Sequence, residues 1–449
     1  MNPPKPTPRP DKVSLWRYLK LFRQDLLSAQ PQRLYRAWMA EFRTVFLRSY
    51  MINQPELVET VLKKRPDDFP KSNRIAEGLR PLLGNSVFLT NGDTWKRQRR
   101  IIDPAFEGGR LKDTFPAMQD AAQAASDRLQ QSLNQILECE EFTSHAAADV
   151  IFRTLFSVPI EHEVAAQVFT KFRAYQRRQP LLNLAAFLPL PSWMPRLHSR
   201  QTKQNAREIR ELIEHLVSAR AALIAQGKAP NDLATKIMTT PDPQTGKCFD
   251  TDEMVDQVAI FFLAGHETSA SALAWALYLL ALYPDWQDKV AEEAAALDTP
   301  GMTAVAGLKI SRDVFRETLR LYPPVPMMVR QATCPEVFRN RQIQPGAQMV
   351  ISPWHLHRHE RLWDNPDGFD PGRWHTENGK TCQRTAFIPF SAGARVCSGA
   401  GFAMVEGPLI LSTLLRRYSF ELVEGQTPVP VAHLTVRSKD GIRLRVVER

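Results

Sequence analysis

Apolar residues recur at helical spacing along most of the chain, so the pattern predicts a protein built mainly of helices. The longest apolar region, residues 258–283, belongs to a segment that reads as one helix over residues 252–283. At 1.5 Å per residue, that helix would be roughly 45–50 Å long. Helical spacing also covers residues 12–40 and nearly everything in residues 95–290, apart from a proline-rich break at residues 188–195.

Small sheets are predicted beside the helices. The alternation typical of strands occupies residues 43–52, 342–353 and 434–447. The first of these resembles a short hairpin, and the last surrounds a turn at Lys439-Asp440-Gly441. Pro55 is typical of the first turn of a helix, whereas residues 69–91 are predicted to be a loop. The fold class is therefore mainly α with small β-sheets.

Chain length and the search for linker segments predict the domain organisation. A length of 449 residues alone would suggest about three domains of ~150 residues each. No Gly/Ser-rich linker, charge run or repeat divides the chain, so we expect one domain over residues 12–449. Residues 1–11 form a proline-rich lead that we expect to be extended and disordered.

The net charge and the cysteine content indicate which kind of partner and which cellular compartment to expect. The net charge is +10, but lysines and arginines are spread along the helices rather than grouped with aromatic residues, which argues against nucleic acid and favours an acidic protein partner. The five cysteines are odd in number and lack a Cys-x-x-Cys pair, so neither a disulfide framework nor a zinc site is expected. A cytoplasmic location is predicted.

A transmembrane anchor is not expected. The apolar region 258–283 contains His266-Glu267-Thr268-Ser269, and a membrane span would bury that carboxylate in lipid. No signal peptide is recognisable at the N-terminus. A basic amphipathic segment near Trp16 and Phe22 has two interpretations: a helix packed on the domain, which we favour, or a membrane-surface contact.

The candidate chemistry centres on Cys397. A helix N-terminus favours the thiolate form of a cysteine, and a thiolate is a good metal ligand. Gly393 can adopt a positive φ angle in a tight loop, Gly399 allows close backbone approach, and Arg395 supplies a cation beside the thiol. An isolated cysteine is most often a small buried apolar residue, but the spacing of its neighbours favours a ligand.

The run from Phe390 to Ala403 matches Phe-x-x-Gly-x-Arg-x-Cys-x-Gly-x-x-x-Ala at every fixed position. It resembles the ligand loop of the cytochrome P-450 haem-thiolate monooxygenases, and the resemblance extends over nearly the whole chain. It implies the cytochrome P-450 fold of the soluble bacterial type. It also implies haem b (iron protoporphyrin IX) on Cys397, with Phe390, Gly393 and Arg395 as haem contacts.

Three further motifs occur in the order that the family has. Ala264 and Thr268 share one helical face, with Glu267 beside them. By themselves they are open to a plain reading, in which Thr268 bonds the Ala264 carbonyl and Glu267 pairs with an arginine. The resemblance implies an oxygen-activating groove at Ala264, in which Thr268 holds reduced oxygen and a water while Glu267 relays protons.

The other two motifs concern haem retention. Trp95 and Arg99 lie on one helical face, and the resemblance makes them contacts of a haem propionate, with Arg330 as a further contact. Lys96, Arg97 and Arg100 would then point outwards, towards the side where an acidic electron donor docks. The resemblance also implies a buried ion network on the cysteine side of the haem, formed by Glu317, Arg320 and Arg373.

One departure concerns the helix after the ligand. It contains Gly407-Pro408, and proline inside a helix costs ~3 kcal/mol. We expect a kink near Met404, about two turns beyond Cys397 at ~3.6 residues per turn, which leaves the ligand unaffected.

The predicted function is a monooxygenase that consumes O2 and inserts one oxygen atom into an apolar substrate: a fatty acid, terpenoid, steroid or aromatic compound. The 52 residues after Cys397 leave no room for a reductase, so electrons from NAD(P)H are expected through a separate ferredoxin or flavodoxin with its reductase. Residues 181–187 and Met327-Met328 suggest an apolar cavity, although core residues give the same letters. The alternatives are a haem-thiolate isomerase or dehydratase and a non-enzymatic haem sensor.

Overall fold

A computed structural model describes residues 2–43, 48–107, 109, 111–178, 200–297, 301–432 and 434–449. The α-helices are α1 (Leu15–Gln24), α2 (Pro55–Glu59), α3 (Asn73–Leu83), α4 (Gly92–Phe106), α5 (Leu111–Leu129), α6 (Cys139–Phe156), α7 (Glu163–Arg178), α8 (Arg200–Ala225), α9 (Leu233–Thr239), α10 (Thr251–Leu282), α11 (Pro284–Ala295), α12 (Met302–Gly307), α13 (Lys309–Leu321), α14 (Pro353–Leu356), α15 (Glu377–Thr385) and α16 (Ala400–Leu415). The strands are β1 (Met39–Arg43), β2 (Arg48–Ile52), β3 (Ile136–Glu138), β4 (Met328–Gln331), β5 (Glu336–Phe338), β6 (Arg341–Ile343), β7 (Gln348–Ile351), β8 (Tyr418–Leu422), β9 (Pro430–Ala432), β10 (Val436–Ser438) and β11 (Arg443–Glu448).

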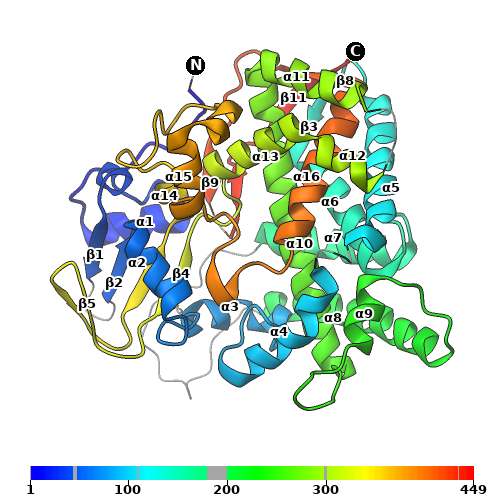
Figure 1. Cartoon of the computed structure of the whole chain (residues 1–449), viewed down its shortest axis with the longest axis horizontal. Coiled ribbons are helices and arrows are strands. Elements are labelled where there is room, and N and C mark those ends of the chain that lie inside the picture. Colours follow the sequence, from blue (N-terminus) through cyan, green and yellow to red (C-terminus); the bar gives the residue numbers. More distant parts are fainter. Residues whose placement is uncertain are drawn as a thin grey trace.

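Helix α10 runs through the middle of the helical part, with α6, α8, α13 and α16 around it (Figure 1). Its start is well defined because Asp250 and Glu253 form a reciprocal capping box. The predicted bounds of this helix were residues 252–283, one residue later at each end than the observed Thr251–Leu282. The expectation of a mainly helical protein with small sheets is confirmed.

The largest sheet, in the order β1-β2-β7-β4, lies on the opposite side of the molecule from α5 (Figure 1). The predicted hairpin is present as β1 and β2, which pair antiparallel, but β1 begins at Met39. The Lys439-Asp440-Gly441 turn joins strands of different sheets, since β10 pairs with β9 while β11 pairs with β3 and β8. Short sheets of this kind lie beside the helices rather than forming a layer of their own.

The predicted loop over residues 69–91 is wrong, because α3 occupies its middle. Ser72 caps this helix by accepting a hydrogen bond from the Arg74 backbone N–H. Gly78 and Pro81 lie inside the helix and conceal its periodicity. Residues 12–40 are less helical than predicted, with α1, a short 3-10 turn at Gln32–Tyr35 and the start of β1.

The proline-rich lead is extended, and it packs on the domain where the structure describes it. Lys5 forms an ion pair with Asp367, and the Tyr322 hydroxyl donates a 2.8 Å hydrogen bond to the Pro4 carbonyl. The Arg9 backbone N–H donates to the Gln30 carbonyl at 3.1 Å. These contacts differ from the predicted disorder of residues 1–11.

Helix α16 continues through Pro408 from Ala400 to Leu415. A Cβ atom at Gly407 would lie 2.4 Å from the Phe315 ring of α13, so glycine lets the two helices approach closely. The kink near Met404 stays a prediction. Within the described residues, no helix is long and apolar enough to span a bilayer.

Candidate functional site

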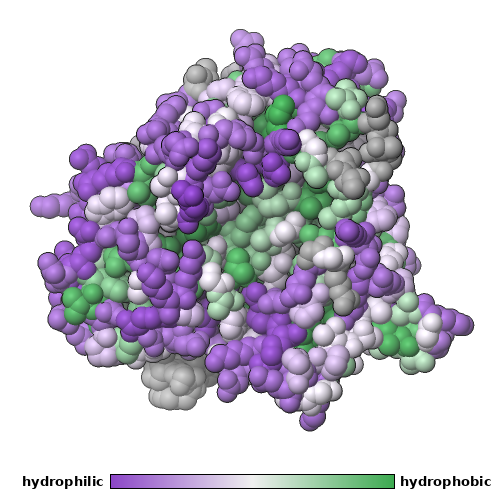
Figure 2. Space-filling view, viewed as in Figure 1, coloured by the Kyte–Doolittle hydropathy of each residue, from purple (hydrophilic) through white to green (hydrophobic). Residues whose placement is uncertain are grey.

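An exposed stripe on an otherwise buried helix marks the site. From Met254 to Leu280, every residue of α10 is buried except Phe261, Ala264, Gly265 and Thr268. These four recur at helical spacing, so they share one face of α10. A buried helix exposes such a face only where it borders a space inside the fold. In Figure 2, a hollow with an apolar floor lies near the middle of the visible surface.

Helix α4 connects this stripe to the Cys397 loop. Near its C-terminal end, the Phe106 ring lies 5.7 Å from the Phe261 ring of α10. About two helical turns before Phe106, Arg99 donates a 2.7 Å hydrogen bond to the Val396 carbonyl. The Ser398 hydroxyl donates to Asp103 at 2.8 Å. The thiol and the exposed face of α10 are therefore held by the same helix.

Gly393 fixes the shape of the ligand loop. Its φ angle is +71°, and a Cβ atom there would lie 2.1 Å from the Leu62 carbonyl oxygen. Any other residue would both strain the backbone and collide with it. The loop is closed by the Cys397 N–H, which donates to the Phe390 carbonyl at 2.9 Å. The predicted role of Gly393 in a tight turn is confirmed, and no comparable restriction applies at Gly399.

Cys397 has solvent-accessible surface. Nearby protein still desolvates its thiol, which raises the thiol pKa, while the Gly399 backbone N–H and Arg99 act to lower the pKa. The thiolate expected of Cys397 as a metal ligand stays a prediction. A bound cationic metal would favour the thiolate.

Three basic side chains lie over the Trp95 ring, and Trp95 is 7% exposed. The cationic groups of Arg395, Lys71 and Arg99 lie 4.7, 5.8 and 5.8 Å from its ring centroids. Burial and the neighbouring arginines, Arg330 first among them, lower the pKa of Lys71 to about 6. Burial and Arg395 lower the pKa of Arg330 to about 10. We call Lys71, Arg99, Arg330 and Arg395 the cation cluster.

The charges of this cluster are only partly balanced within the described residues. Arg99 pairs with Asp103 at 2.7 Å, whereas Arg395 has only the largely exposed Asp67 at 3.8 Å. The buried Arg395 Nε atom has no hydrogen-bond partner. Such a cluster lowers its energy by binding a ligand with two carboxylates, and haem b has two propionates. The residues present therefore fit the expected group.

Lys71 is the member of the cluster that sequence reasoning missed. It lies in the region predicted to be a loop, just before α3, and no motif identifies it. Its position becomes evident only in three dimensions, where its backbone forms an isolated bridge with Arg330. By contrast, Trp95, Arg99, Arg330 and Arg395 come together as their shared role predicts.

Thr268 and Glu267 on α10 make the structural contacts that the sequence also allowed, to the Ala264 carbonyl and to an arginine. The Thr268 hydroxyl donates to the Ala264 carbonyl at 2.5 Å. Glu267 is 7% exposed, and its Oε1 atom accepts hydrogen bonds from Thr435 at 2.7 Å and Arg437 at 2.9 Å. Thr268 nevertheless belongs to the exposed stripe, so its side chain remains available to a ligand.

Gly265 packs against a neighbouring helix. A Cβ atom there would lie 2.4 Å from the Ile151 side chain of α6, so this glycine allows α6 and α10 to approach. The neighbouring His266 is buried, and its Nε2 atom shares a 2.6 Å hydrogen bond with Ser144. Desolvation lowers the pKa of His266 to about 3.

The predicted ion network is present and buried. Glu317 and Arg320 have fully buried side chains 2.8 Å apart, and Arg373 donates to the same carboxylate at 2.9 Å. Arg320 also donates to the carbonyls of His357, Pro366 and Gly368. Every donor of the network thus has a backbone or carboxylate acceptor nearby, as a buried charge requires.

The prediction that Lys96, Arg97 and Arg100 point outwards is correct only for Lys96, which is 47% exposed. Arg97 donates to Glu253 at 2.5 Å, and Arg100 donates to the fully buried Asp242 at 2.5 Å. This partnership lowers the pKa of Asp242. Arg97 and Arg100 therefore tie α4 to the segment before and at the start of α10.

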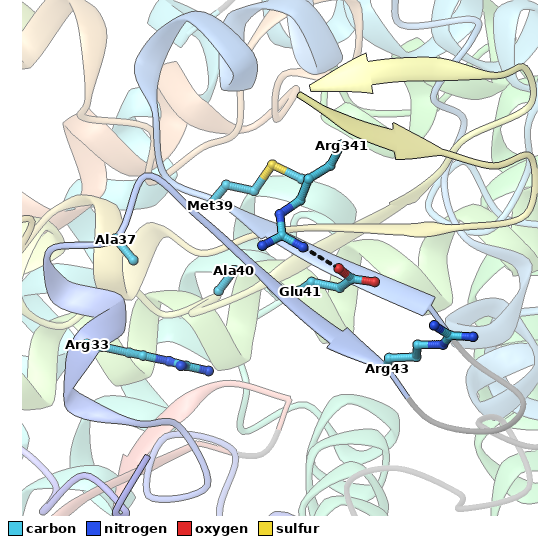
Figure 3. A pocket seen from close by; sticks show the side chains of 7 residues that line it. All are labelled: Arg33, Ala37, Met39, Ala40, Glu41, Arg43 and Arg341. Atoms are coloured by element: carbon cyan, nitrogen blue, oxygen red, sulfur yellow. Dashed lines mark hydrogen bonds and ion pairs between the residues drawn. The ribbon is translucent and has the colours of Figure 1, made fainter. Parts of the chain in front are cut away.

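The apolar cavity segments give a mixed result. Residues 181–187 and the proline-rich break 188–195 lie outside the described residues. Met327 is partly buried against the core. A pocket of about 470 Å³ lies elsewhere, at β1, and is lined by Arg33, Ala37, Met39, Ala40, Glu41, Arg43 and Arg341. Arg341 and Glu41 point towards each other there (Figure 3), so this pocket is polar and separate from the Cys397 site.

Comparisons with known proteins agree with this geometry. A crystal structure of the cytochrome P450DA heme domain superposes with a TM-score of 0.81, covering 100% of this chain and 98% of that one at 24% identity, which shows the fold. Cyclooctat-9-en-7-ol 5-monooxygenase of Streptomyces melanosporofaciens is 31% identical over 397 residues, covering 87% of this chain and 84% of that protein.

Similar proteins come from several kingdoms. Cytokinin hydroxylase of Arabidopsis thaliana is 27% identical over 401 residues, covering 88% of this chain and 77% of that protein. Cytochrome P450 4A14 of Rattus norvegicus is 28% identical over 433 residues, covering 91% and 82%. Bacterial, plant and animal proteins are thus all similar to the chain, and a bacterial type does not follow.

The family model described as Cytochrome P450 matches residues 8–446, nearly the whole chain. Together with the ligand loop, the stripe on α10 and the cation cluster, this match identifies the chain as a member of the cytochrome P450 monooxygenase family.

Proposed function

We propose that the protein uses haem b to insert one atom of O2 into an apolar organic substrate, with electrons from a separate redox protein. The single observation that carries the proposal is that α4 contacts both the loop of the exposed Cys397 and the exposed face of α10. One wall offers a metal ligand, and the other offers small side chains and a hydroxyl. A flat metal cofactor with substrate above it fits between such walls.

Several residues would hold the cofactor. Cys397 would ligate the iron as a thiolate, and the cation cluster with the Trp95 indole N–H would bind the propionates. Haem supplies the binding and reductive activation of O2, with electron donation from the thiolate favouring O–O cleavage. Phe390, Gly393 and Ala264 would contact the ring from the loop and from α10.

Thr268 and Glu267 are proposed to manage protons. The Thr268 hydroxyl faces the space, and its bond to the Ala264 carbonyl leaves its oxygen free to accept a hydrogen bond from a ligand or water. Glu267 lies next along α10 and is connected through Arg437, 35% exposed, to the surface. In this proposal Glu267 delivers protons to the space beside Thr268.

The electron donor is proposed to be a ferredoxin or flavodoxin that receives electrons from NAD(P)H through its reductase. Lys63 and Lys96 are exposed near the outer side of the ligand loop, where the Leu62 carbonyl lies under Gly393. Such lysines suit an acidic protein surface. The free cysteines suit a reducing compartment, so we propose a cytoplasmic location.

The substrate class remains broad: a fatty acid, terpenoid, steroid or aromatic compound. Two of the similar proteins are named for the oxidation of cyclooctat-9-en-7-ol and of 11-oxo-beta-amyrin, and another is named cytokinin hydroxylase, so these names do not favour one of the four classes. An isomerase or dehydratase would have no use for a proton relay, and a sensor would not need redox partners. Dependence of turnover on O2 and NAD(P)H separates these three functions.

The test is the Thr268→Ala variant. Productive turnover converts RH, O2, NAD(P)H and H⁺ into ROH, H2O and NAD(P)⁺, whereas uncoupled turnover gives H2O2 and no ROH. We expect Thr268→Ala to bind haem and substrate normally and to divert NAD(P)H consumption to H2O2. Equal product per NAD(P)H in variant and wild type would contradict the proposed role.

The matched control is Thr413→Ala on α16. Thr413 is also partly buried and donates to the carbonyl four residues earlier, that of Leu409, at 2.7 Å. It therefore has the same helical hydrogen bond without lying on the exposed face of α10. Its coupling ratio should equal that of the wild type.

A further inference from the structure

A buried acid lies on the helix that follows the haem ligand. Glu406 is the only ionisable residue between Ala400 and Leu415, and it is 2% exposed. Its Oε2 atom accepts a 2.7 Å hydrogen bond from the Ser269 hydroxyl of α10. Its Oε1 atom is buried without a hydrogen-bond partner in the described part of the chain. A buried polar group this poorly satisfied needs a reason to persist.

The apolar surroundings of Glu406 favour its neutral form. Burial raises its pKa to about 8, and the Ser269 hydrogen bond opposes that rise only in part. Among the described residues of α5, α10, α11 and α13, which pack on α16, no charged side chain contributes to this pKa. With a pKa near 8, roughly nine molecules in ten carry the proton at pH 7.

The Glu406–Ser269 hydrogen bond joins the two walls of the site. Glu406 follows Cys397 by nine positions, on the helix that the ligand loop opens. Ser269 is buried, and it is the neighbour of Thr268, which belongs to the exposed stripe of α10. Moving the Ser269 backbone relative to α16 therefore also moves Thr268 relative to Cys397.

We propose that Glu406, through its hydrogen bond to Ser269, is a positioning residue that holds Thr268 in place relative to the Cys397 loop. This proposal rests on the proposed monooxygenase function. A neutral carboxyl group tolerates the apolar surroundings and keeps its bond to Ser269. An ionised carboxylate, without a cation nearby, would separate the two helices or draw in water.

The experiment measures product per NAD(P)H between pH 6 and pH 9 in the wild type, Glu406→Gln and Glu406→Leu, with redox partners and substrate. Gln keeps an acceptor for Ser269 and does not ionise. Product per NAD(P)H should therefore change less with pH in Glu406→Gln than in the wild type. Wild-type coupling should fall about tenfold between pH 7 and pH 9, following the neutral fraction. Glu406→Leu should be poorly coupled throughout.

A second measurement does not require turnover. The free energy of urea unfolding of the wild type should fall more steeply between pH 5 and pH 8 than that of Glu406→Gln, because a carboxyl group with a raised pKa binds more protons in the folded than in the unfolded state. Identical pH profiles of the wild type and Glu406→Gln in both measurements would overturn the proposal. Absence of product from every variant, with the difference in stability present, would instead refute the monooxygenase function and leave the Glu406–Ser269 bond standing.

Discussion

Replacing Glu317 by alanine should be among the most damaging single changes outside the haem site. Glu317 is the common partner of Arg320 and Arg373, and all three side chains are at most 5% exposed. The variant leaves both guanidinium groups buried and without a carboxylate. The Asp370 backbone N–H also loses its acceptor, the Glu317 Oε1 atom at 3.1 Å.

The expected loss follows from the burial of these charges. Breaking a buried ion pair by removing one partner costs about 3–5 kcal/mol, and the total free energy of unfolding of a domain is typically about 5–15 kcal/mol. The carbonyl acceptors of Arg320 and Arg373 persist in the variant, which keeps the cost within this range. Glu317→Gln should lose a similar amount because it also removes the negative charge.

The assay is the free energy of urea unfolding of the purified protein, together with its haem content. Glu377→Ala is the matched control: Glu377 also pairs with a cation three residues later, Lys380, but its side chain is 91% exposed. The control should unfold like the wild type. A Glu317→Ala protein with wild-type stability and full haem content would refute the buried network.

Three other predictions concern the cluster, the loop and acid stability. Lys71→Met should release haem to apomyoglobin faster than the wild type, because the variant lacks one of the basic side chains proposed to bind the propionates; slower haem release would contradict this. Gly393→Ala should lose at least about 1–3 kcal/mol of unfolding free energy from backbone strain at φ +71°, and it should also abolish the thiolate-type spectrum. The control Gly425→Ala, at φ +73° with open space around the glycine, should lower stability without changing the spectrum. Burial lowers the pKa of His357 from 6.5 to about 3. Below pH 6.5 the unfolded state therefore binds more protons than the folded state, and stability should fall from there towards pH 3. Urea unfolding from pH 7 to pH 4 should show a shallower fall in stability for His357→Gln than for the wild type, and an equal slope would count against this prediction.

Local features of the site could be predicted from the sequence. The helix at residues 251–282 is long and apolar, and the ligand loop is one continuous run, so both follow from neighbours in the chain. The network of Glu317, Arg320 and Arg373 was predicted through the family resemblance, since a Glu and an Arg three residues apart usually form an exposed pair.

Contacts between distant segments could not be predicted. The partner of Glu267 is Arg437, 170 residues later, and the partner of Glu406 is Ser269, 137 residues earlier. Nothing in the local pattern around these residues specifies such pairs.

The spectrum of the reduced, carbon monoxide-bound protein tests the central claim most directly. The wild type and Cys382→Ala should both show the red-shifted Soret band of thiolate-bound haem. Cys382 is a suitable control because it is buried and donates its S–H to the Leu362 carbonyl at 3.1 Å. Cys397→His should abolish the band. A band that survives in Cys397→His, or disappears in Cys382→Ala, would contradict the assignment of Cys397 as the haem ligand.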